Sequence, residues 1–197
     1  MVEPTDAEFE PMRIDGFSRD ARVLDLAAFR ARHGEGFLIH DGPLLPERRV
    51  KRPQRTLVIA PPGTTDPAPA RASGGPAAQL VRGPEPSPEL RVFQIRHTGR
   101  SPYPRIITVG RTRNNDVVVP DVVMSKFHAF FKEEEGAFFL SDAESRNGTF
   151  VDGKSVPSTK QGKPALVQPG ARVRFGMIEL WFVDAEGLLE LARNSTR

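Results

Sequence analysis

Three short groups of residues with side chains suited to binding an anion follow one another within residues 110–149. They are Gly110-Arg111, Ser125-x-x-His128 and the run Ser145-Arg146-Asn147-Gly148-Thr149. An arginine guanidinium can hold two oxygens of a phosphate at once, a serine hydroxyl can donate to a phosphate oxygen, and an asparagine amide can both donate and accept. This chemistry fits a phosphorylated peptide, which offers a dianionic group beside a hydrogen-bonding backbone.

Short apolar runs of the kind found in β-strands separate these groups. The runs cover 105–109, 117–119, 127–131 and 137–140, and turn residues such as Asp152-Gly153 and Pro169-Gly170 break the later sequence. Residues 172–175 alternate between charged and apolar side chains, and 178–183, which holds the only tryptophan, is typical of a buried strand. The pattern predicts an all-β sandwich in which strand ends bring the arginine, serine and asparagine to one edge.

The order, spacing and residue types of the three groups resemble the forkhead-associated (FHA) domain, a β-sandwich that binds phosphothreonine peptides. The resemblance spans residues 90–184 and implies a twisted β-sandwich of mostly antiparallel strands that acts as a non-enzymatic adaptor in Ser/Thr-kinase signalling. The phosphopeptide-binding residues that it implies are Arg111, Ser125, Lys126, Arg146 and Asn147. The residues expected to support the binding loops are Gly110, His128, Gly148 and Thr149.

Two positions depart from the family pattern. Lys126 stands where the family usually has arginine, and Arg146 stands where a small polar residue is common, so it stays open whether either contacts phosphate. Asp116 and Asp142 resemble acidic residues that bond loop backbone. Residues 122–124 either meet the peptide about three positions after the phosphothreonine, where they would favour an apolar residue, or pack into the core.

Other kinds of function find less support. Ser125, His128 and Asp142 suggest a hydrolase triad, but no Gly-x-Ser-x-Gly turn surrounds the serine, and the histidine is structural in the resembled family. The chain has no cysteine, and its other histidines have no metal-ligand spacing, so we expect no enzyme activity, cofactor or metal. The formal net charge of +3 is too small to favour nucleic acid.

The composition divides the chain into four parts. Residues 1–60 are expected to form a largely disordered arm or docking segment, with a short helix over 19–32 that Ser18 caps and Gly34 ends. Residues 61–89 are rich in Pro, Gly and Ala and predict a linker. The FHA domain at 90–184 is expected to fold alone, and 185–197 to add a short helix and tail.

The expected partners are threonine-phosphorylated proteins, the substrates of a Ser/Thr kinase. A phosphate-independent interaction scaffold is the alternative. Thr64 or Thr65 in the linker, once phosphorylated, would also be an intramolecular ligand. The basic run at 48–52 is a solvated charge run or, alternatively, an anion or nucleic-acid patch. Because no secretory signal and no bilayer-length apolar run is present, we expect a soluble cytoplasmic protein.

Overall fold

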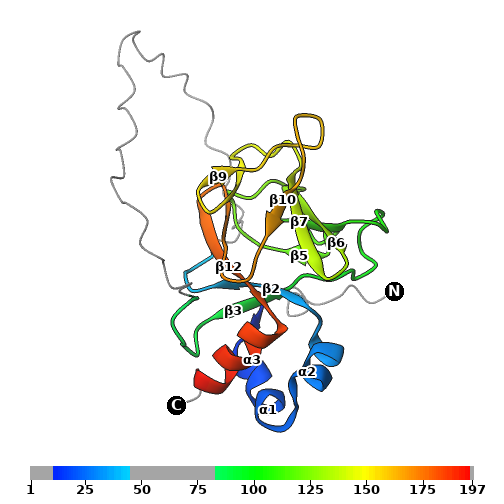
Figure 1. Cartoon of the computed structure of the whole chain (residues 1–197). Helices are drawn as coiled ribbons and strands as arrows, with labels where there is room; N and C mark the ends of the chain where they lie inside the picture. The colour runs from blue at the N-terminus through cyan, green and yellow to red at the C-terminus, as the bar shows by residue number, and fades with distance from the viewer. Residues whose placement is uncertain (1–10, 45–82, 196–197) are drawn as a thin grey trace, which may run out of the picture.

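Two β-sheets pack face to face, and three helices cover the outer face of the larger sheet (Figure 1). The computed structural model describes residues 11–44 and 83–195, and statements about structure refer to these ranges. The larger sheet contains, in spatial order, β1 (Met12–Arg13), β3 (Arg91–Gln94), β2 (Gly36–His40), β12 (Ile178–Asp184), β11 (Arg172–Phe175), β8 (Thr149–Val151) and β9 (Lys154–Ser155). The smaller sheet contains β10 (Ala165–Val167), β7 (Ala137–Asp142), β6 (Ala129–Glu134), β4 (Ile107–Gly110) and β5 (Val117–Val118).

Alternating side chains from both sheets form the core between them. In β11, Val173 and Phe175 are fully buried while Arg172 is exposed, and Phe131 and Leu140 meet them from the other sheet. Neighbouring strands are antiparallel except β4 and β5, which pair in parallel. The structure confirms the all-β sandwich that the alternating pattern predicted.

The region expected to hold one helix holds two. Helix α1 covers Asp15–Val23 and helix α2 covers Leu26–His33. The chain is extended at Leu24, and the Asp25 carboxylate then accepts a hydrogen bond from the backbone N–H of Ala28 at 2.8 Å. Asp25 therefore starts a second helix. Ser18, the expected cap, lies inside α1 and is buried.

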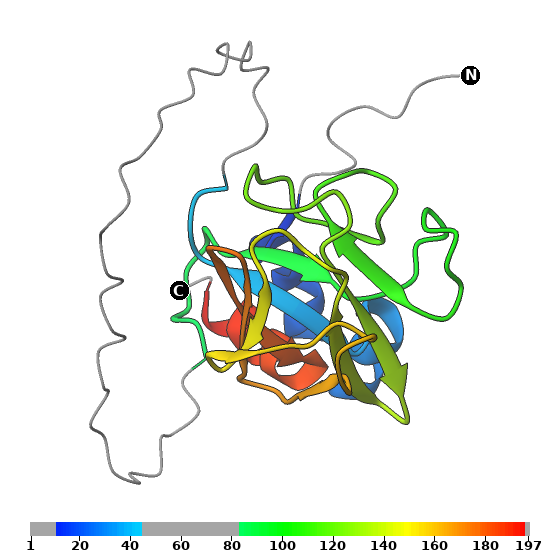
Figure 2. The same cartoon turned by 90° about the horizontal axis from the view of Figure 1, so that it is seen from above.

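Strand β2 corrects the expectation of a largely disordered N-terminal arm for residues 11–44. It lies in the middle of the larger sheet, between β3 and β12 (Figure 2). Phe37, Leu38 and Ile39 are completely buried. These residues could not form a core alone, but a place between two strands that are far away in the sequence buries both of their faces. The folded unit therefore includes residues before the predicted boundary at 90.

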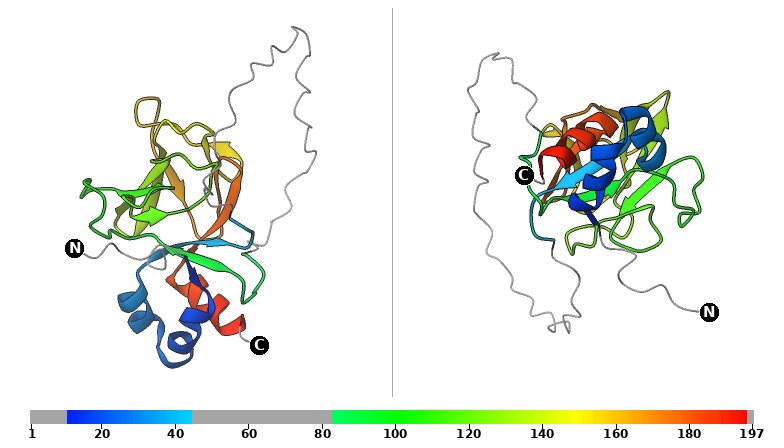
Figure 3. Two further views of the ribbon diagram at one scale, coloured as in Figure 1. Left: turned by 180° about the vertical axis from the view of Figure 1, so that it is seen from behind. Right: turned by 90° about the horizontal axis from the view of Figure 1, so that it is seen from below.

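The three helices form a second apolar core with the outer face of the larger sheet (Figure 3). The C-terminal helix α3 (Ala185–Asn194) matches the predicted short helix, and the Asp184 carboxylate caps it by accepting from the Gly187 N–H at 2.8 Å. Phe17 from α1 and Phe29 from α2 pack in the same cluster as Leu188. Within the described ranges no helix is both long and apolar enough to cross a bilayer.

The Pro-rich segment connects two neighbouring strands of one sheet. His40 at the end of β2 pairs with Arg91 at the start of β3, so residues 41–90 begin and end at the same place on the larger sheet. The predicted linker at 61–89 therefore does not join separately folded parts. Most of it, with Thr64 and Thr65, and the basic run at 48–52 lie outside the described residues.

Candidate functional site

Three loops meet at one edge of the sandwich, which we call the rim. They join β4 to β5 (111–116), β5 to β6 (119–128) and β7 to β8 (143–148). Direct hydrogen bonds between the loops bring together all three groups of residues singled out in the sequence. The rim is therefore the place where the predicted site residues converge.

Gly110 allows the first two loops to touch. A side chain at this position would collide with the backbone carbonyl of Lys126 and would lie 2.8 Å from the amide nitrogen of Asn115. Only glycine leaves room for this approach. The backbone N–H of Arg111 then donates to the carbonyl oxygen of Ser125 at 3.1 Å, which fixes the start of the arginine beside the serine.

The carbonyl of Lys126 accepts hydrogen bonds from two residues that no sequence motif singled out. The Asn115 side chain donates to it at 2.7 Å, and the Thr112 hydroxyl donates to it at 2.9 Å. Asn115 is almost completely buried. Its position in an Asn-Asn-Asp turn was visible in the sequence, but nothing there showed which distant carbonyl it bonds.

His128 joins the second loop to the third. Its Nδ1 accepts a hydrogen bond from the Ser125 N–H at 3.0 Å, so the ring proton lies on Nε2, which donates to the Gly148 carbonyl at 3.2 Å. The ring is completely buried and meets Phe175 edge-on, with ring centroids 5.5 Å apart. Burial lowers the pKa of His128, although the bond to Gly148 and the nearby Asp142 carboxylate oppose this shift. The neutral ring is the form that spans the two loops.

The Ser125 hydroxyl and the third loop are also in contact. The Ser125 oxygen accepts a hydrogen bond from the backbone N–H of Arg146 at 3.1 Å, so its own proton remains available for another acceptor. The side chains of Lys126 and Arg146 are both exposed at the rim. The rim thus presents a donor hydroxyl among cationic side chains.

Asn147 is held from two sides. Its amide nitrogen donates to the Val123 carbonyl at 2.8 Å, while its carbonyl oxygen has no hydrogen-bond partner among the described residues. Gly148, at φ +75°, accepts a hydrogen bond from the Gly176 N–H at 2.8 Å. Gly176, in the turn between β11 and β12, has no space for a side chain because Asn147 packs against it. No pattern in the sequence indicated that this turn supports the site.

Two buried carboxylates tie the loops to the strands below. Asp142 accepts hydrogen bonds from the hydroxyls of Thr149 at 2.6 Å and Ser145 at 2.7 Å. Asp116 accepts from the backbone N–H and the hydroxyl of both Thr98 and Thr108. Burial raises the pKa of Asp116, but these four bonds outweigh burial and hold its pKa below the ordinary value.

The residues before Ser125 divide between surface and core. Val122 is 45% exposed, whereas Met124 is 2% exposed and belongs to the core. Val123 is partly buried and its carbonyl holds Asn147. Within residues 122–124, Val122 is therefore the apolar side chain that is exposed to solvent.

The rim does not pair the Ser125 hydroxyl with His128 as a catalytic base. The two ring nitrogens of His128 bond backbone groups of Ser125 and Gly148, so neither accepts the Ser125 hydroxyl proton. Among the described residues, no group of three or more His, Cys, Asp or Glu side chains could hold a metal ion. The rim can bind an anion, and its polar groups are otherwise used to fix the loops.

Comparisons with known proteins place these residues in a family. The family model described as "FHA domain" matches residues 107–176. The ABC transporter ATP-binding/permease protein Rv1747 of Mycobacterium tuberculosis is 36% identical over 145 residues, which are 70% of this chain and 16% of that protein. The glycogen accumulation regulator GarA of the same organism is 31% identical over 119 residues, which are 59% of this chain and 70% of GarA.

Solved structures of FHA domains also resemble the chain. The FHA-2 domain of the Mycobacterium tuberculosis transporter Rv1747 is 26% identical, with a TM-score of 0.35, and the match covers 66% of this chain and 92% of that one. The FhaA FHA domain complexed with the intracellular domain of Rv3910 is 23% identical, with a TM-score of 0.38, and the match covers 47% of this chain and 87% of that one.

Proposed function

Because the chain belongs to the FHA-domain family, we propose that it is a non-enzymatic adaptor that binds phosphothreonine peptides of Ser/Thr-kinase substrates at the rim. The observation that supports the proposal is the set of hydrogen bonds that joins the three loops carrying Arg111, Ser125 and Asn147. The chain spans 16% of the length of the transporter Rv1747 and 70% of the length of GarA. The signalling pathway in which this chain acts is therefore part of the proposal.

The phosphate would lie between the first two loops. The Arg111 guanidinium supplies a planar pair of donors for two phosphate oxygens, and the Ser125 hydroxyl donates its remaining proton. Lys126 adds a point charge from the neighbouring position. Each of these contacts strengthens with the second negative charge of the phosphate, which favours a phosphorylated residue over a carboxylate.

Recognition of the peptide backbone would fall to the third loop. The Asn147 carbonyl oxygen is available to accept from a peptide N–H, while its amide nitrogen is anchored to Val123. The Thr149 hydroxyl ties the end of this turn to Asp142, and His128 bonds the Gly148 carbonyl and so holds the turn against the β5–β6 loop. A preformed asparagine loses little conformational entropy on binding, which improves affinity.

Phosphate dependence is the property to test first. The full chain is probed with a degenerate phosphothreonine peptide array, and one selected peptide is then titrated by calorimetry in phosphorylated and unphosphorylated forms. We expect binding of the phosphorylated form alone. Equal affinity for both forms would reject the proposal in favour of a phosphate-independent scaffold, which Lys126 and Arg146, the two departures from the family pattern, would then explain.

A cytoplasmic location follows from the proposed kinase pathway and remains a prediction. An intramolecular role for Thr64 or Thr65 also remains a prediction, since both threonines lie outside the described residues. Comparing the peptide affinity of the full chain before and after phosphorylation at these positions tests it.

A further inference from the structure

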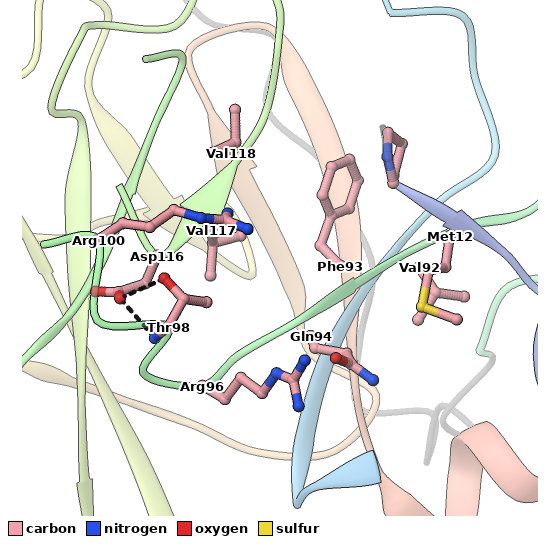
Figure 4. A pocket seen from close by; sticks show the side chains of 11 residues that line it. Met12, Val92, Phe93, Gln94, Arg96, Thr98, Arg100, Asp116, Val117 and Val118 are labelled. Atoms are coloured by element: carbon pink, nitrogen blue, oxygen red, sulfur yellow. Dashed lines mark hydrogen bonds between the residues drawn. The ribbon is translucent and has the colours of Figure 1, made fainter. Parts of the chain in front are cut away.

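A groove runs along the side of the sandwich, between the edge pair β1–β3 of the larger sheet and the edge strand β5 of the smaller sheet (Figure 4). Its volume is about 180 Å³. Phe93 and Val117 line it with apolar side chains that are almost completely buried. Arg96 and Arg100 are exposed, and the Arg100 side chain reaches toward Val117 (Figure 4). None of the residues proposed to bind the phosphopeptide lines this groove.

The chain around the groove is strongly basic. Residues 90–115 contain no aspartate or glutamate, and their arginines are Arg91, Arg96, Arg100, Arg105, Arg111 and Arg113. Asp116 also lines the groove, but its two carboxylate oxygens accept hydrogen bonds from Thr98 and Thr108. Arg96 makes no ion pair with any of the described residues. The groove therefore attracts a negatively charged group.

The groove begins next to the rim. Val118, which lines the groove, lies opposite Gly110, the residue before Arg111. Paired strands are about 4.8 Å apart and packed sheets about 10 Å apart, so the groove extends from roughly 5 to 15 Å from Gly110. An extended peptide covers about 3.3 Å per residue, so a ligand held at the rim reaches the groove roughly two to five residues from its phosphothreonine.

The free edge of β5 can bond the backbone of such a peptide. The Val119 N–H donates to the Gly110 carbonyl of β4 at 2.9 Å. Because backbone groups alternate along a strand, Val118 directs its own N–H and carbonyl to the opposite side. On that side β5 is the last strand of the smaller sheet among the described residues. An exposed strand edge is a template for an extended chain, so the groove offers backbone hydrogen bonds as well as positive charge.

We propose that the phosphothreonine ligand carries an acidic residue, roughly two to five positions from the phosphothreonine, that lies in the groove against Arg96 and Arg100. This placement rests on the proposed function, because the rim must hold the phosphate for the groove to receive a flanking residue. An arginine guanidinium can bind both oxygens of a carboxylate. Nucleic acid would need a longer row of phosphate contacts than two arginines supply.

Calorimetric titration of the full chain with substituted peptides tests this inference. The probe is the phosphothreonine peptide selected on the array, in which each position up to about six residues on either side is replaced in turn by Glu, Gln or Lys. Within the predicted range, glutamate should bind about 1.5- to 5-fold more tightly than glutamine, the range for an exposed ion pair, and lysine should bind more weakly. Equal affinities of the glutamate and glutamine peptides at every position would overturn the proposal.

Protein variants assign the effect to the groove. Arg96→Gln and Arg100→Gln should each reduce the preference for glutamate over glutamine, and Arg96→Glu should shift the preference toward lysine. Arg105→Gln removes the same charge from the same β3–β4 loop, but Arg105 does not line the groove, so the preference should remain. A glutamate preference that survives in the double variant of Arg96→Gln and Arg100→Gln would reject the proposal.

The same peptides without phosphate separate this proposal from the proposed function. Equal affinity of the phosphorylated and unphosphorylated peptides would reject the proposed function. Phosphate dependence without a glutamate preference would reject the acidic-residue proposal alone. A duplex DNA probe that competes with the phosphopeptide, and that Arg96→Gln weakens, would assign the groove to nucleic acid and would also reject it.

Discussion

Replacing Leu38 by alanine tests the most consequential feature of the fold, the position of β2 inside the larger sheet. Leu38 is completely buried, lies opposite Phe93 and Phe182 in the neighbouring strands, and belongs to the core between the sheets. Truncation of such a leucine costs about 2 to 5 kcal/mol, which combines lost burial with the cavity that remains. A flexible arm attached outside the domain would lose almost nothing.

The measurement is urea-induced unfolding followed by the fluorescence of Trp181, the only tryptophan of the chain. Trp181 lies opposite Ile39 of β2, so its signal reports on this pair of strands. For a chain of this size the expected loss lowers the melting temperature by about 5 to 15 °C. Leu166→Ala is the matched control, because Leu166 is 47% exposed, and it should change stability by no more than about 1 kcal/mol.

A Leu38→Ala protein that unfolds at the same urea concentration as Leu166→Ala would refute the reasoning. The same reasoning predicts that residues 90–197 without the N-terminal part do not fold stably, because β3 and β12 would both lose the strand that pairs with them. A stable, cooperatively unfolding fragment 90–197 would therefore also contradict it.

Four further predictions concern the rim. Arg111→Ala should weaken phosphopeptide binding in calorimetry by about 2 to 4 kcal/mol, as for one partner of a desolvated charge contact, with an unchanged melting temperature. Gly110→Ala should lower stability by about 1 to 3 kcal/mol in thermal unfolding, since its side chain meets the Lys126 carbonyl. Burial holds the pKa of His128 below its ordinary value of 6.5, so the unfolded chain takes up the proton at a higher pH than the folded chain. The free energy of unfolding should therefore fall as the pH drops below 6.5, and it should fall less in His128→Gln. Phosphothreonine should bind about fivefold more tightly than phosphoserine in matched peptides, if the resemblance extends to a pocket for the methyl group.

Local patterns were enough to predict the sandwich and the residues of the rim. Gly110 ends β4, Arg111 follows it, and Ser125 lies in the loop before β6. Their types and spacing are set by short-range requirements that are visible in the sequence: a close backbone approach, a cationic fork and a hydroxyl. The alternation at 172–175 likewise depends on which face of a single strand is buried. The short C-terminal helix followed from its apolar spacing.

Tertiary structure alone decided where the N-terminal residues belong and how the rim is held. The run 37–39 is apolar and strand-like, but only the partners β3 and β12, more than 50 residues away in sequence, provide the burial that offsets its ordering entropy. Asn115 and Gly176 act through carbonyls and side chains of other loops. The sequence determines which hydrogen-bonding and apolar groups each residue has, and the fold determines which distant groups they contact.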